Sequence, residues 1–255
     1  MGRSATFSAD GAVGFVTLDV ESCDLAAMRA FGAAVEAALG SDVRVVVVRS
    51  ERAGWFAGGP EPAGLLDGGV DALREVARVS REAFRRITAA PQVFVAHLNG
   101  RALGAGLELA LACDLRYASA GRYALGMPEV TLGLLPGNGG TQRLTRQLGP
   151  ARALDLLLTG RSFGPDEALA WGLVSAVFPA AEAADRVRAA AERLATGPAL
   201  ALAAIKRAVH EGGELSLDHG LALELRLLDR LLRSGDALEG LRAYAEKRPP
   251  AFAGR

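Results

Sequence analysis

The chain has 255 residues, 29 Lys and Arg against 29 Asp and Glu, and 50% hydrophobic residues. This length and apolar content predict one large α/β domain with an appendage, and the zero net charge argues against a nucleic-acid-binding surface. Cys23 and Cys113 are the only cysteines, too few for a disulfide framework, and no apolar run approaches the ~20 residues of a membrane span. These features favour a cytoplasmic protein that binds neither nucleic acid nor membrane.

The first half of the chain alternates predicted strands and helices. Asp10-Gly11 predicts a hairpin between strands at 5–8 and 13–18. Asp24 is a candidate N-cap for a helix that Gly40 ends. After it come a strand, a loop rich in Gly and Pro, a helix stopped by Pro91 and another strand, at 43–49, 55–69, 73–87 and 93–98. This alternation is typical of an α/β fold with parallel strands.

The second half is mostly helical. Extended segments are expected at 115–118 and 123–125, and helices at 141–148, 151–158, 165–171, 182–195, 198–211, 216–232 and 236–248. A break near Gly197-Pro198 divides the chain into a core at 1–197 and a helical region at 198–255. Leucines lie on two faces of the helix at 216–232, so it must bury more than one side, which predicts a trimer or hexamer.

Two glycine-rich turns each follow a predicted strand. They are Ala57-Gly58-Gly59-Pro60 and Gly104-Ala105-Gly106. Turns of this kind let backbone N–H groups point into a cleft, and two such groups on one oxygen would form an oxyanion hole. The alternative is that both are tight turns that serve packing alone.

Two glutamates lie among apolar residues close to these turns. Glu108 follows the second turn by two residues, and Glu129 follows Met127-Pro128. A carboxyl group in an apolar pocket has a raised pKa and can exchange protons near neutral pH. The alternative is a solvated charge in the first turn of a helix.

Several runs of sequence, in this order, together resemble the enoyl-CoA hydratase/isomerase (crotonase) superfamily. They are NGRALGAGLELA at 99–110, MPEVTLG at 127–133, PGNGGTQRL at 136–144, LTGR at 158–161, EALAWGLV at 167–174 and EKRPPAF at 246–252. The resemblance covers nearly the whole chain. It implies a crotonase-like spiral of ββα units with a helical C-terminal trimerisation region, assembled as a homotrimer or as a dimer of trimers.

The resemblance also implies an enoyl-CoA hydratase that acts on an acyl-CoA thioester, with no metal and no redox cofactor. By motif, the backbone N–H groups of Gly59 and Ala105 would hold the thioester oxygen, and Glu108 and Glu129 would hold a water and move protons. Isomerases of the family typically use a glutamate at the second position only, so two glutamates favour a hydratase. Further candidate contacts to the acyl-CoA are Ala57, Gly58 and Lys247.

The sequence departs from the family pattern at three places. Pro60 stands where an Asp is usual, Ala105 stands where a Gly is usual, and an acidic segment at 19–25 replaces a longer, often basic loop that helps hold the CoA nucleotide. These departures leave room for a pantetheine thioester on a carrier protein as substrate. They also leave open an isomerase, another crotonase-type reaction, or an assembly protein without catalysis.

A serine hydrolase is the remaining alternative. Gly160-Arg161-Ser162-Phe163-Gly164 matches the G-x-S-x-G pattern, and Asp185 and His210 follow in the order of a catalytic triad. That motif needs a strand before it, whereas a helix is expected at 151–158. The three histidines lack metal-ligand spacing, and His97 is expected to be a hydrogen-bonded core residue.

Overall fold

The computed structural model describes residues 5–59 and 62–254, and the side chains at 62–68 lie outside that description. Its large sheet has the order β1-β2-β3-β5-β7-β9, in which β1 and β2 are antiparallel and every later pair is parallel. The strands of this sheet are β1 (Ala5–Asp10), β2 (Val13–Leu18), β3 (Val45–Ser50), β5 (Val93–Leu98), β7 (Leu115–Ser119) and β9 (Ala176–Phe178).

A small parallel sheet lies beside the large one and has the order β4-β6-β8. Its strands are β4 (Trp55–Ala57), β6 (Arg101–Leu103) and β8 (Leu125–Gly126). Each strand of the small sheet directly follows a strand of the large sheet, and a helix comes next in the chain. The expected spiral of ββα units is therefore confirmed. Its repetition brings the ends of β4, β6 and β8 together.

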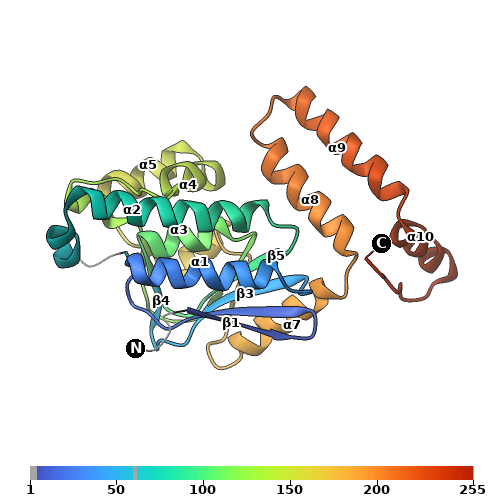
Figure 1. The fold of residues 1–255 in the computed structure, drawn as a ribbon, viewed down its shortest axis with the longest axis horizontal. Helices are drawn as coiled ribbons and strands as arrows, with labels where there is room; N and C mark the ends of the chain where they lie inside the picture. Colours follow the sequence, from blue (N-terminus) through green and yellow to red (C-terminus); the bar gives the residue numbers. More distant parts are fainter. Residues whose placement is uncertain (1–4, 60–61, 255) are drawn as a thin grey trace.

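The helices surround the sheets in two layers and an extension (Figure 1). Helices α1, α2 and α3 cover one face of the large sheet, and α7 packs on the other face. Their bounds are α1 (Leu25–Leu39), α2 (Pro62–Ala89), α3 (Ala105–Ala112), η1 (Pro128–Leu132), α4 (Gly140–Leu148), α5 (Pro150–Thr159), α6 (Pro165–Ala170), α7 (Ala183–Ala195), α8 (Ala199–Gly212), α9 (Leu217–Leu232) and α10 (Gly235–Glu246). None of the described helices is long and apolar enough to cross a membrane.

Local sequence signals account for most of these elements. Asp24 caps α1 by accepting a hydrogen bond from the Ala27 N–H at 2.8 Å, and Gly40 ends the helix, as expected. The valine run of β3 is buried on both faces because helices cover both sides of the parallel sheet. His97 is a buried core residue on β5, where its ring lies 3.0 Å from Ser119 Oγ, and this expectation is also confirmed.

The prediction of a loop over 55–69 is wrong. Trp55–Ala57 form β4, whose Phe56 is fully buried, and α2 begins at Pro62. Glycine and proline are tolerated here because Gly69 adopts a non-helical conformation (φ 65°) that kinks α2, and Pro62 occupies the first position of the helix. The three-residue strands β6 and β9 and the short 3-10 helix η1 were also not predicted, since each is too short to show a periodic pattern.

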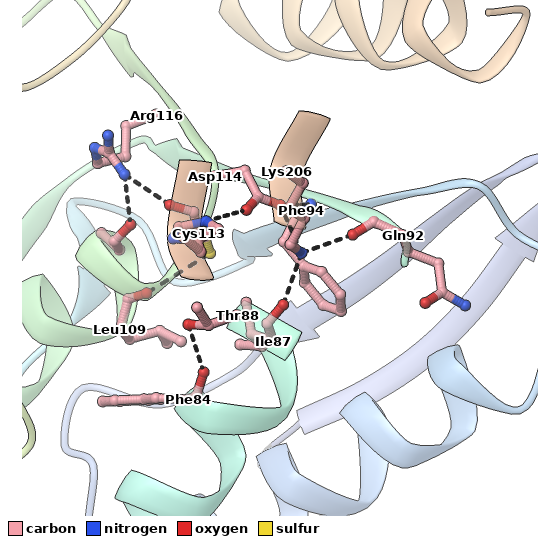
Figure 2. Close-up of polar contacts among 12 residues, drawn as sticks. Phe84, Ile87, Thr88, Gln92, Phe94, Leu109, Cys113, Asp114, Arg116 and Lys206 are labelled. Atoms are coloured by element: carbon pink, nitrogen blue, oxygen red, sulfur yellow. Dashed lines mark hydrogen bonds and ion pairs between the residues drawn. The ribbon is translucent and has the colours of Figure 1, made fainter. Parts of the chain in front are cut away.

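The C-terminal helices extend away from the α/β body (Figure 1). Lys206 fastens α8 to the body, because its ammonium group donates to the carbonyl oxygens of Ile87 and Gln92 and pairs with Asp114 at 2.9 Å (Figure 2). On α9, Leu223 and Leu227 are buried, as one predicted face requires. The other predicted face, formed by Leu217, Leu221, Leu225, Leu228 and Leu232, is exposed in the single chain.

Candidate active site

The candidate site lies where the ends of β4 and β6 meet the start of α3. Gly106 permits this close approach, because a Cβ atom at that position would collide with the carbonyl oxygen of Ala57. Gly58 is similarly enclosed, and a Cβ there would lie 2.7 Å from the carbonyl oxygen of Glu21. Glycine at these two positions therefore permits close packing, which also brings the backbones of the two turns together.

Gly59 and Ala105 lie on facing sides of this junction. A Cβ atom built on Gly59 would lie 4.0 Å from the amide nitrogen of Ala105. Ala105 is the first residue of α3, so its N–H has no partner within the helix and carries the positive end of the helix dipole. Pro60, the other departure in this turn, lies outside the described residues. The two residues predicted to supply oxyanion donors therefore lie close together.

Glu129 faces the same junction from η1. A Cβ atom built on Gly104 would lie 2.8 Å from Glu129 Oε1 and 3.7 Å from the Cα of Gly59. Oε2 of Glu129 is buried and has no hydrogen-bond partner among the described residues. Burial, together with a smaller contribution from the nearby charge of Glu108, raises the pKa of this carboxyl group to about 7. Glu129 can therefore carry or release a proton near neutral pH.

Glu108 lies in the first turn of α3 and is only 1% exposed. Its Oε1 accepts hydrogen bonds from the backbone N–H groups of Asn138 and Gly140, at 2.7 and 2.8 Å. Its Oε2 accepts one from the side-chain amide of Asn138 at 2.8 Å. Burial raises the pKa of Glu108, while these three donors and the nearby Arg143 oppose that shift by stabilising the carboxylate. The loop at 136–140 thus holds the group in one orientation.

Asn138 and Arg143 are site residues that sequence reasoning did not single out. Both lie inside the PGNGGTQRL run that carried the family resemblance. Nothing in the spacing of either residue predicts that it lies near Glu108, which is 30 residues before Asn138 in the chain. Arg143 supports the loop by donating to the carbonyl oxygen of Asn138 at 2.9 Å. Arg81 on α2 supports it from the other side by donating to the carbonyl oxygen of Gly137 at 2.6 Å.

Of the three remaining candidate residues, two lie at the junction and one lies away from it. Ala57 and Gly58 lie at the junction itself, at the end of β4. Lys247 ends α10, which lies beyond α8 and α9 in Figure 1, so this single chain does not bring Lys247 to the junction. Arg52 forms ion pairs with two acidic residues of the segment at 19–25, Asp19 at 3.1 Å and Glu21 at 3.4 Å. That segment therefore carries less unbalanced negative charge than the sequence indicates.

The G-x-S-x-G segment does not form a serine-hydrolase site. Helix α5 precedes it, as expected, and not the strand that the motif requires. His210 on α8 is 2.9 Å from Asp114, and Asp185 lies in the first turn of α7. The thiols of Cys23 and Cys113 are both buried, and burial raises the pKa of each to about 12, so neither is poised as a nucleophile.

Comparison with known proteins adds independent evidence. Residues 13–255 match the model of the family described as enoyl-CoA hydratase/isomerase. The chain is 43% identical over 171 residues to the 2,3-dehydroadipyl-CoA hydratase of Escherichia coli K12, an alignment that covers 67% of this chain and 66% of that protein. It is 36% identical over 251 residues to a probable enoyl-CoA hydratase of Rhizobium meliloti 1021, and this alignment covers 95% of each.

The first curated relatives are thus matched over slightly less than two thirds of their own length. Among solved structures, the chain is similar to an enoyl-CoA hydratase from Geobacillus kaustophilus HTA426. The two chains superpose with a TM-score of 0.95 and 37% sequence identity, over 100% of this chain and 98% of that one.

Proposed function

This chain belongs to the enoyl-CoA hydratase/isomerase family, and we propose that it is a hydratase that adds water across the α,β double bond of an enoyl thioester. The observation that carries the proposal is that Glu108, which is buried, and Glu129, which is half-buried, lie beside the junction where Gly59 approaches the amide nitrogen of Ala105. An isomerase of this family would need the second glutamate alone. The presence of the first, held in place by three donors, favours hydration.

The first role falls to the backbone. The N–H groups of Gly59 and Ala105 would hold the thioester oxygen, and negative charge grows on that oxygen as the β-carbon is attacked. Preorganised donors of this kind stabilise the transition state by about 3–4 kcal/mol each, because they need no reorganisation when the charge develops. The dipole of α3 adds to the effect at Ala105.

The two glutamates have complementary protonation states. Glu108, ionised, takes a proton from water as the water oxygen bonds to the β-carbon, and the π electrons of the double bond move to the thioester oxygen. Glu129, protonated, gives its proton to the α-carbon as the enolate collapses. A pKa of about 7 for Glu129 supports this role, since a good share of the carboxyl groups keep their proton at neutral pH. Proton exchange with solvent restores both groups.

A carrier-bound pantetheine thioester is the second candidate substrate. The acidic segment at 19–25 has no basic residue of its own, and Arg52 is already paired with two of its acids, Asp19 and Glu21. We expect the protein to bind the adenosine end of CoA weakly, so enoyl-pantetheine should react nearly as well as enoyl-CoA. A steep fall in CoA affinity with added salt would instead indicate basic contacts to the phosphates.

A homotrimer or a hexamer is the proposed assembly. The exposed leucine face of α9 includes Leu217, Leu221 and Leu225, which are 52% to 77% exposed in the single chain. Exposure of an apolar face of this size to water is unfavourable, and the same helical region in a second and a third copy of the chain could bury it. Light scattering at micromolar concentration should return a multiple of three times the 26.4 kDa protomer. A monomer would contradict the proposal.

The test of the function is a panel assay. Straight-chain 2-enoyl thioesters of increasing length, on CoA and on pantetheine, are followed by the loss of ultraviolet absorbance of the conjugated thioester. At least one should be hydrated, and Glu129→Gln should lower kcat at least about hundredfold. Glu182→Gln, an exposed carboxyl on the surface of the molecule, is the matched control and should leave turnover unchanged. Turnover of 3-enoyl thioesters alone would favour the isomerase, and no turnover at all would favour an assembly protein.

A further inference from the structure

The side chain of Asn138 has an unusual position in the site. It is 8% exposed, it lies in the loop between η1 and α4, and its amide nitrogen donates to Glu108 Oε2 at 2.8 Å. Its backbone N–H donates to the other oxygen of the same carboxyl group at 2.7 Å. Arg143 fixes its carbonyl oxygen. Asn138 thus donates a hydrogen bond to each oxygen of the Glu108 carboxyl group, and Arg143 in turn holds Asn138 in place.

The chemistry of this contact fixes which way the Asn138 amide points. A carboxylate accepts hydrogen bonds and cannot donate them, so the atom that faces Glu108 Oε2 is the NH₂ group. The amide oxygen, Oδ1, must then point elsewhere. It is buried and finds no hydrogen-bond partner among the described residues. An unpaired buried acceptor is costly, so a polar ligand atom or an ordered water is expected beside it.

We infer that Asn138 positions the water that adds to the double bond: its NH₂ group orients Glu108, and its Oδ1 accepts one hydrogen of that water while Glu108 Oε2 accepts the other. Oδ1 and the NH₂ group are bonded to the same carbon, so one water can reach both Oδ1 and Glu108 Oε2. With both O–H bonds engaged, the water presents a lone pair to the β-carbon. This inference rests on the proposed hydratase function and adds a positioning residue to it.

The inference separates two reactions that the same site can perform. Addition of water needs Glu108, Asn138 and the water itself. Exchange of an α-proton of a saturated acyl thioester needs no water addition: Glu129 takes the proton from the α-carbon, the enolate rests on the backbone N–H groups, and Glu129 returns a deuteron gained from D₂O. A residue that positions the water should therefore matter for hydration and not for exchange.

The experiment compares Asn138→Ala with the unchanged protein in both reactions. For hydration of the best 2-enoyl thioester, kcat should fall at least about tenfold with little change in KM. Exchange into the matching saturated thioester in D₂O should stay within about twofold. Loss of the amide donor should also raise the pKa of Glu108, so the acidic limb of the hydration pH profile should move to higher pH.

Two further variants guard the result. Asn138→Asp keeps the size of the side chain but loses the donor to Glu108, so it should also lose at least about tenfold in hydration. Gln142→Ala changes an exposed residue of the adjoining helix, whose side chain forms hydrogen bonds with Thr141 and Arg146, and should change neither reaction.

Three results would overturn the inference. They are hydration within twofold of the unchanged protein in both Asn138 variants, equal losses in hydration and exchange, and an unmoved pH profile. If the unchanged protein exchanges α-protons but hydrates no thioester, the proposed function fails first, and the positioning role fails with it.

Discussion

The carboxyl groups beside the two ends of α3 differ in how fully they are hydrogen-bonded. At the amino end, Glu108 and Glu129 leave buried acceptors free: Oε2 of Glu129 and, beside Glu108, Oδ1 of Asn138 have no partner among the described residues. Just beyond the carboxyl end, Asp114 accepts from the Phe94 N–H at 2.7 Å, from Lys206 at 2.9 Å and from His210 at 2.9 Å. The Asp114 carboxylate has partners on both of its oxygens, whereas Oε2 of Glu129 and Oδ1 of Asn138 remain available to a ligand.

The pairing around Lys206 is complete. Its ammonium group has three hydrogens, and it faces three acceptors: the carbonyl oxygens of Ile87 and Gln92 and the carboxylate of Asp114 (Figure 2). Arg116 completes the region by donating to the carbonyl oxygen of Cys113 just after α3. Burial with complete pairing indicates a structural role, whereas burial with unpaired oxygens indicates a site that a ligand completes. The contrast predicts which region controls turnover and which controls stability.

The largest expected effect is at the amino end. Glu108→Gln should lower kcat for hydration by about 10²- to 10⁴-fold, because the amide cannot take a proton from water. The free energy of unfolding should change by less than about 1 kcal/mol, since the Asn138 amide can rotate and offer Oδ1 to the new NH₂ group. Initial rates and denaturant titration measure the two quantities. Near-normal turnover, or a large loss of stability, would place Glu108 with the structural carboxylates.

The second effect is at the carboxyl end and should have the opposite signature. Lys206→Met removes one partner from a buried ion pair and should lower the free energy of unfolding by about 3 kcal/mol or more. The rate constants of the protein that remains folded should stay within a few-fold. Arg207→Met is the matched control: Arg207 lies on the same helix in an exposed pair with Glu211, and its loss should cost less than about 1 kcal/mol. Equal costs for the two variants would contradict the contrast.

The sequence predicted the two regions unequally. Glu108 and Glu129 could be found because each lies in a short run that resembles a known family, next to a glycine-rich turn. Lys206 could not, since a lysine within a helical run is most often solvated, and its partner Asp114 is 92 residues away in the chain. Asn138 could not be predicted either, because its partner Glu108 is 30 residues away in the chain. Contacts between segments that are distant in the chain depend on the fold, whereas the sequence alone shows only the local motifs within each segment.

Secondary structure shows the same division. Helices with caps and a periodic apolar face, such as α1, were predicted close to their observed ends. The glycine- and proline-rich stretch at 55–69 was not, because burial of Phe56 and pairing with β6 outweigh the local preference of this stretch for a loop. Tertiary packing decides such segments. At this site, packing also brings Gly59 close to Ala105.

A third prediction tests the backbone donors at the amino end. Ala105→Val places a β-branched side chain at the start of α3, where the thioester carbonyl must approach, and should lower kcat/KM about tenfold or more. Ala105→Gly removes the methyl group and should stay within about twofold. Steady-state kinetics on one enoyl thioester measures both, and thermal unfolding confirms that the fold persists. An unchanged kcat/KM in the valine variant would exclude Ala105 from the oxyanion hole.

The smallest expected effect is a pH dependence of stability that arises from Glu129, at the amino end of α3. The pKa of Glu129 is about 7 in the folded chain and near 4.5 when the chain is unfolded. The folded state therefore holds the proton more tightly, so this group costs nothing below pH 4.5, destabilises progressively as pH rises from 4.5 to 7, and has a constant cost above that. Glu129→Gln cannot ionise and escapes the cost.

The stability of Glu129→Gln relative to the unchanged protein should thus rise between pH 5 and pH 8. We expect a rise of about 1 kcal/mol, well below what the full shift would give, because the carboxyl group is partly exposed and solvent screens it. Denaturant titrations at the two pH values measure the difference, with Glu182→Gln as a control that should show none. A constant difference would mean that Glu129 is as well paired as Asp114. The free oxygen that distinguishes the amino end of α3 would then already have a partner in the ligand-free protein.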